Sequence, residues 1–122
     1  MIKWQELITG TLNWRQEKAE YRQFKARVAA LPADYQFVFT QIQGYLWQFA
    51  DFTGYRMLAA QTELLVMFED GATQQRSVFT ITGDDVGAFA ENIVQSVADT
   101  WLDARRQKVN RQIANYRQRH QL

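Results

Sequence analysis

Apolar residues recur at helical spacing along most of the chain. Four large ones follow one another seven, three and four positions apart, namely Trp14, Tyr21, Phe24 and Val28. A second series is spaced three, one, three, four and three positions apart and comprises Tyr35, Val38, Phe39, Ile42, Leu46 and Phe49. Residues at such intervals share one face of a helix. The pattern predicts a helix that ends near Leu31, because the residue before a proline avoids the α region, and a second helix over 33–50 at the centre of the fold.

Several details of these helices are predicted from single residues. Residues 2–8 are expected to form a separate short segment that stops at Gly10, so that Thr11 or Asn13 caps the next helix. Gly44 is expected to permit a close helix crossing. Two large side chains lie off the central stripe, Phe37 and Trp47. A helix that is apolar on more than one side is usually sandwiched between neighbours.

A third helix is predicted after a connection at 51–54. Its apolar positions are Met57, Ala60, Leu64, Met67 and Phe68, and it is expected to end near Gly71. The stretch 77–82 is rich in β-branched residues. We interpret it as a short extended linker held by Phe79 and Ile81, with a strand that pairs across a dimer as the alternative.

The last helix is predicted to begin at Thr82, with Thr82 as its cap, Asp85 at the third helical position, and Ile81 packed against Val86. No proline follows, and no glycine follows Gly87, so an unbroken helix to residue 117 would be about 50 Å long. Its apolar stripe turns by about 150° around the axis near residue 101. Before the turn lie Val86, Phe89, Ala90, Ile93, Val97 and Trp101, and after it lie Leu102, Val109, Ile113 and Tyr116. The helix is therefore expected either to break at 101–103 or to change the element on which it packs. The second stripe either completes the domain's own core or docks on another chain.

These patterns together predict an all-α protein with about five helices in a compact bundle. The whole chain, 1–122, is expected to be a single domain with a mobile tail at 118–122.

The residue types exclude most kinds of chemistry. There is no cysteine, and the one histidine is His120, two residues from the end. Adjacent carboxylates occur at 69–70 and 84–85, but neighbours on a helix point in different directions and do not converge as an acid–base pair does. No glycine-rich phosphate loop occurs. We therefore predict no catalytic residues, no metal site and no cofactor. Without a signal-peptide core or a membrane-spanning run, the protein is expected to be soluble and cytoplasmic.

The small net charge conceals a division along the chain. Residues 1–33 carry six basic and three acidic side chains. Residues 34–103 carry two basic and ten acidic side chains, and residues 104–122 carry six basic side chains and no acidic one. We interpret this as basic ends that lie beside an acidic middle, within one molecule or across a dimer. An acidic partner is the alternative.

Four segments, in the same order, resemble the domain-of-unknown-function family 1048. They are residues 24–35 (FKARVAALPADY), 42–47 (IQGYLW), 64–69 (LLVMFE) and 78–86 (VFTITGDDV), and the resemblance extends over roughly 14–116. It implies a small bacterial protein with an all-helical, left-handed superhelical fold and no assigned biochemical function. It also associates the chain with genes for PadR-type transcriptional regulators, which implies a regulatory or partner role and no catalytic residues.

We therefore expect a non-enzymatic interaction or regulatory accessory protein. Its partner would be a transcription regulator or a second copy of the chain, and no membrane is involved. The candidate contact residues are Arg105, Lys108, Arg111 and Tyr116. One alternative is a nucleic-acid-associated protein that uses the basic residues of the terminal helix, which are Arg105, Arg106, Lys108, Arg111, Arg117 and Arg119. Another is a small-ligand binder with a cavity lined by Phe37, Tyr45 and Trp47.

Overall fold

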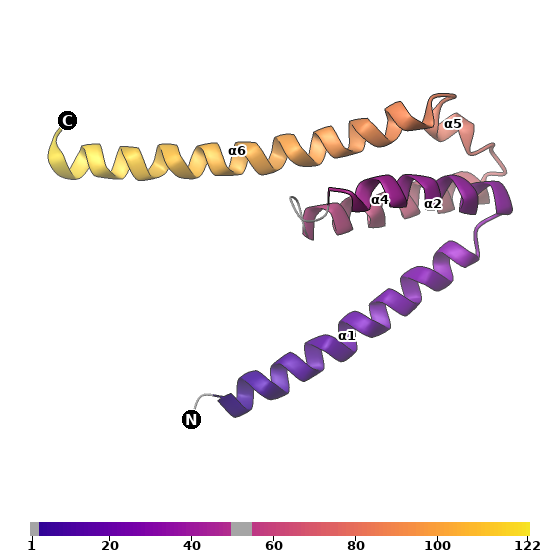
Figure 1. Ribbon diagram of the computed structural model, residues 1–122, viewed down its shortest axis with the longest axis horizontal. Helices are drawn as coiled ribbons and strands as arrows, with labels where there is room; N and C mark the ends of the chain where they lie inside the picture. Colours follow the sequence, from indigo (N-terminus) through magenta and orange to yellow (C-terminus); the bar gives the residue numbers. More distant parts are fainter. Residues whose placement is uncertain (1–2, 50–54) are drawn as a thin grey trace.

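A computed structural model describes residues 3–49 and 55–122 of the chain. These residues form five helices, which are α1 (Lys3–Ala29), α2 (Ala33–Trp47), α4 (Tyr55–Thr73), α5 (Phe79–Thr82) and α6 (Val86–His120). The predicted all-α fold is thus confirmed over the described residues. Helices α2, α4 and the first half of α6 pack into a small bundle, and the end of α1 joins it (Figure 1). The start of α1 and the second half of α6 extend from this bundle as two arms (Figure 1).

Helix α2 is the centre of the bundle, as the apolar spacing predicts. It contacts α1, α4 and α6. The buried residues of α2 are Tyr35, Val38, Phe39, Ile42 and Leu46. The ring of Phe39 lies 5.9 Å from that of Phe24 on α1 and 5.8 Å from that of Phe68 on α4, so one aromatic side chain links three helices. Rings at such distances add a specific attraction to the burial of their apolar surface.

The two off-stripe aromatics do not lie between neighbours. The side chains of Phe37 and Trp47 are 67% and 48% exposed. The neighbouring helices cover the side of α2 that carries the stripe and leave these two positions to solvent. The expectation that α2 is sandwiched at Phe37 and Trp47 is wrong.

The close helix contact occurs at a different glycine from the one predicted. A Cβ at Gly44 would meet nothing within 4 Å, whereas a Cβ at Gly71 would lie 2.5 Å from Cδ1 of Ile81 and 2.8 Å from the hydroxyl of Tyr35. The same hydroxyl donates a hydrogen bond of 2.8 Å to the carbonyl of Arg76. Gly71 therefore lets the end of α4 approach both α2 and α5, and α4 continues two residues past it.

Helix α1, like α4, continues past a glycine. Helix α1 runs without interruption through Gly10, so the predicted break there, and the caps at Thr11 or Asn13, are wrong. A glycine costs about 1 kcal/mol of helix propensity relative to alanine, which by itself does not end a helix. The connection predicted at 51–54 lies outside the described residues.

The segment 77–82 is not extended. Phe79–Thr82 form α5, a single helical turn. The Ser77 side chain accepts a hydrogen bond from the backbone N–H of Phe79 at 3.3 Å, and Val78 is buried beneath the turn. Val78 and Ile81, three positions apart, face the core together only in a helical turn, and this burial overrides the β propensity of the residues. Phe79, predicted as an anchor, is exposed.

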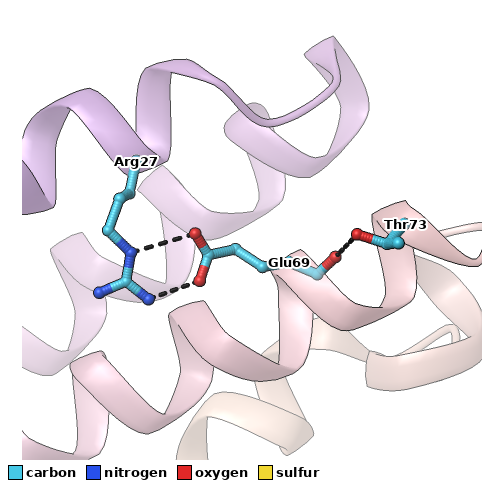
Figure 2. A network of polar contacts seen from close by, with 3 residues as sticks. All are labelled: Arg27, Glu69 and Thr73. Atoms are coloured by element: carbon cyan, nitrogen blue, oxygen red, sulfur yellow. Dashed lines mark hydrogen bonds and ion pairs between the residues drawn. The ribbon is translucent and has the colours of Figure 1, made fainter.

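An ion pair fastens α1 to α4 (Figure 2). The guanidinium of Arg27 donates two hydrogen bonds to the Glu69 carboxylate, from Nε at 3.1 Å and from the terminal nitrogen at 2.5 Å. These hydrogen bonds hold the pKa of Glu69 below its usual value and raise that of Arg27. On the same turn of α4 the Thr73 hydroxyl donates to the Glu69 carbonyl at 2.9 Å.

Candidate interaction surface

Helix α6 begins later than the cap signals suggest. Gly83 has a φ of 75°, a left-handed conformation that ends α5 and separates it from α6. The side chain of Asp85 then accepts a hydrogen bond from the backbone N–H of Ala88 at 2.9 Å, so Asp85 is the cap. Thr82, the predicted cap, is buried at the end of α5 and donates to the Gly83 carbonyl.

From Val86 the helix is continuous for 35 residues, so the break at 101–103, one of the two predicted alternatives, does not occur. Its two halves differ in what they contact. The proximal half, 86–101, packs on the core through Val86, Phe89, Ala90, Ile93, Val94 and Val97. The distal half, 102–120, carries an outer apolar face whose four side chains are exposed by 53%, 60%, 53% and 51%; they are Leu102, Val109, Ile113 and Tyr116. The interpretation that this stripe completes the domain's own core is wrong.

The outer apolar face points away from the bundle. At 100° per residue it lies about 150° around the helix from the stripe that meets the core. In Figure 1 the bundle lies beneath α6, and the distal half passes beyond the ends of α2 and α4. Because α6 is one rigid helix, its distal half cannot fold back onto the described part of the domain. The described helices therefore leave this face uncovered.

Charged and aromatic side chains flank this face. The guanidinium of Arg105 lies 3.9 Å from the centre of the Trp101 ring, a cation–π contact. Arg106 pairs with Asp103 at 2.6 Å. The ring of Tyr116 lies 4.1 Å from that of His120. The surface is therefore an apolar strip with basic edges.

The predicted contact residues do not form one patch. All four are exposed, but only Arg105 and Tyr116 lie beside the outer apolar face. Lys108 and Arg111 turn away from its centre by about 110° and 170°. Leu102, Val109 and Ile113 were not named as contact residues, but the sequence marks them as the second apolar stripe, for which docking on another chain was one of the two alternatives. Their spacing of seven and four is that of a coiled-coil seam.

The other candidate sites find less support in the geometry. The exposed side chains of Phe37 and Trp47 cannot line an enclosed cavity, and Tyr45 packs against Phe49 at 5.2 Å between ring centres. An open hollow of about 730 Å³ beside α6 is lined by Asp99, Thr100, Leu102, Asp103 and Arg106.

Among the described residues, no group of three His, Cys, Asp or Glu side chains is arranged to hold a metal ion. Within residues 3–49 and 55–122, no helix is both long and apolar enough to cross a membrane.

Comparison with known proteins identifies the family. The sequence profile of DUF1048, described as a protein of unknown function, matches residues 12–114. The chain belongs to the DUF1048 family. This DUF1048 chain matches no curated protein. Among solved structures it is similar to a DUF1048 protein from Bacillus cereus ATCC 10987, whose crystal structure has a left-handed superhelix fold. The two are 50% identical over 62% of this chain and 94% of the other, with a TM-score of 0.57. The resemblance in sequence and the expected superhelical fold are both confirmed.

Proposed function

We propose that this DUF1048 chain is a non-enzymatic regulatory accessory protein that binds a protein partner through the outer apolar face of α6. One observation carries the proposal: four large apolar side chains, each about half exposed, share a face that none of the helices in residues 3–49 and 55–122 covers. Isolated exposed apolar residues are ordinary, but an aligned set rimmed by polar residues is typical of an interaction site.

The energetics of such a contact are favourable. Burying the exposed half of each side chain contributes about 1 kcal/mol, so the four together supply several kcal/mol toward association. An amphipathic helix that lies against a groove or another helix is a common recognition mode. The face is built on a rigid helix, so little conformational entropy is lost on binding. The basic edges favour a partner with acidic side chains around its apolar surface.

The resemblance to a family associated with PadR-type regulators suggests the class of partner. We propose a transcription regulator, bound in the cytoplasm. In this role the chain would need no catalytic residues, metal or cofactor, and its function would depend on the residues of the outer apolar face.

A capture experiment tests the proposal. Tagged wild-type chain, Ile113→Glu and Asn115→Glu are incubated with lysate of the native host, with and without nuclease, and the retained proteins are identified by mass spectrometry. Ile113→Glu places a charge on the outer apolar face, whereas Asn115→Glu places the same charge on the opposite side of the same helix turn. We expect one specific protein to be retained by the wild type and Asn115→Glu but not by Ile113→Glu, regardless of nuclease.

Two results would contradict the proposal. Equal retention by Ile113→Glu and wild type would show that the face is not the binding site. Loss of retention after nuclease treatment would instead favour nucleic-acid association through the basic residues opposite the face, Lys108, Arg111 and Arg119.

A further inference from the structure

The outer side of α6 is exposed along its whole length. Residues at spacings of three and four continue the line of the outer apolar face back through the proximal half, and these are Ala88, Glu91, Gln95 and Asp99. The bundle covers the opposite side of the proximal half. One uninterrupted helical surface of about 50 Å is thus available to a partner.

Charge divides α6 and the two residues that precede it into an acidic part and a basic part, with Asp103 between them. Residues 84–99 carry four acidic side chains and no basic one, namely Asp84, Asp85, Glu91 and Asp99. Residues 105–120 carry six basic side chains and no acidic one. All ten of these side chains are exposed. Because the helix is straight and continuous, the basic half cannot reach the acidic half of its own molecule.

We propose that a second copy of this chain binds along the outer side of α6, antiparallel, with a two-fold axis near Leu102. An axis there brings residue 120 of one copy opposite residue 84 of the other, and residue 105 opposite residue 99. The basic half of each copy then lies along the acidic half of its partner, twice by symmetry. A parallel arrangement would place six basic side chains against six, which is unfavourable.

Side-chain size fits the same arrangement at Tyr116. With the axis at Leu102, Tyr116 of one copy lies opposite Ala88 of the other, next to Gly87. Val109 lies opposite Gln95, close to Ala98. Tyr116 therefore meets a small residue, whereas Ile113 lies opposite Glu91 and Val109 opposite Gln95, whose aliphatic stems can cover them. At the axis the two Leu102 side chains meet each other.

This inference rests on the proposed function in using the same face, but its occupant is a second copy of the chain, so the second copy and the proposed regulator would compete for that face. The test is sedimentation equilibrium of the full chain from about 1 to 100 µM. We expect the wild type to reach twice its 14.3 kDa mass, and Asn115→Glu to behave like it. Ile113→Glu should weaken dimerisation at least tenfold, with circular dichroism confirming that it remains folded.

A charge exchange tests the antiparallel register. Asp99→Arg alone and Arg105→Asp alone each place like charges opposite one another, and each should weaken the dimer several-fold. An equimolar mixture of the two variants places opposite charges together again and should recover the dimer. A dimer that Ile113→Glu leaves unchanged, or two variants whose mixture shows no recovery, would overturn this arrangement.

The same proteins separate this inference from the proposed function. A wild type that remains monomeric at 100 µM excludes the dimer. If that monomer still retains a host protein through Ile113, the proposed function stands without the dimer. If it retains none, both proposals fail.

Discussion

At the scale of single residues, two glycines inside helices have opposite roles. Gly44 is exposed with open space at its Cβ position, and Gly71 is enclosed by Ile81 and Tyr35. We expect Gly44→Ala to raise the free energy of unfolding by up to about 1 kcal/mol, because alanine favours the helix. Gly71→Ala gains the same propensity but displaces two packed side chains, and we expect a net loss of about 1 kcal/mol. Urea titration of both variants measures this, and a stabilising Gly71→Ala would contradict the described crossing of α4 with α5.

The ion pair between Arg27 and Glu69 makes stability depend on pH. The hydrogen bonds from Arg27 lower the pKa of Glu69 in the folded state, so the pair stabilises the fold fully above the unfolded pKa of about 4.3, and this contribution disappears as the pH falls through the lower folded value. Both side chains are more than a third exposed, at 41% and 35%, which keeps the contribution below about 1 kcal/mol.

The corresponding test is Glu69→Gln. We expect it to lower the free energy of unfolding by about 0.5 kcal/mol at pH 7 and to match the wild type near pH 3, as measured by urea titration at both pH values. Glu63→Gln, which changes an exposed carboxylate on the same helix, serves as the control. A deficit of Glu69→Gln that persists unchanged at pH 3 would show that the charge of Glu69 is not its cause.

At the scale of elements, the distal half of α6 is separable from the bundle. Its apolar side chains are exposed, so we expect truncation after Asp103 to leave a folded chain that unfolds cooperatively with a loss below about 1 kcal/mol. Truncation after Asn92 should abolish folding, because Ile93, Val94 and Val97 pack on the core. Circular dichroism during thermal unfolding distinguishes these results. Loss of the cooperative transition in the chain truncated after Asp103 would mean that the distal half supports the fold.

The elements differ in how far their sequences define them. The position and buried face of helix α2 are predictable because its apolar spacing, the preceding proline and its burial all agree, although the helix ends at Trp47 and not at residue 50. Helix α5 is not predictable from its sequence, because its β-branched residues favour an extended chain. Only the burial of Val78 and Ile81 stabilises the helical turn instead. The start of α6 is ambiguous for a similar reason. Thr82 and Asp85 are both good capping residues, and the left-handed backbone at Gly83 selects the second.

At the scale of the whole molecule, the candidate surface results from unequal helix lengths. Helices α2 and α4 have 15 and 19 residues, and α6 has 35. At 1.5 Å per residue α6 exceeds α4 by about 24 Å, so part of it has no neighbour. The sequence predicts the rotation of the apolar stripe and the residues on each face. It does not reveal which face is covered, because that depends on where other helices end and on how they cross.

The continuity of α6 gives the molecule the properties of a lever. Its first half is clamped in the bundle by Ile93 and Val97, and its second half is a stiff arm about 28 Å long. A force applied near Tyr116 acts as a torque on those clamped contacts rather than bending the rod. A partner bound to the arm would therefore load the core contacts of Ile93 and Val97 directly.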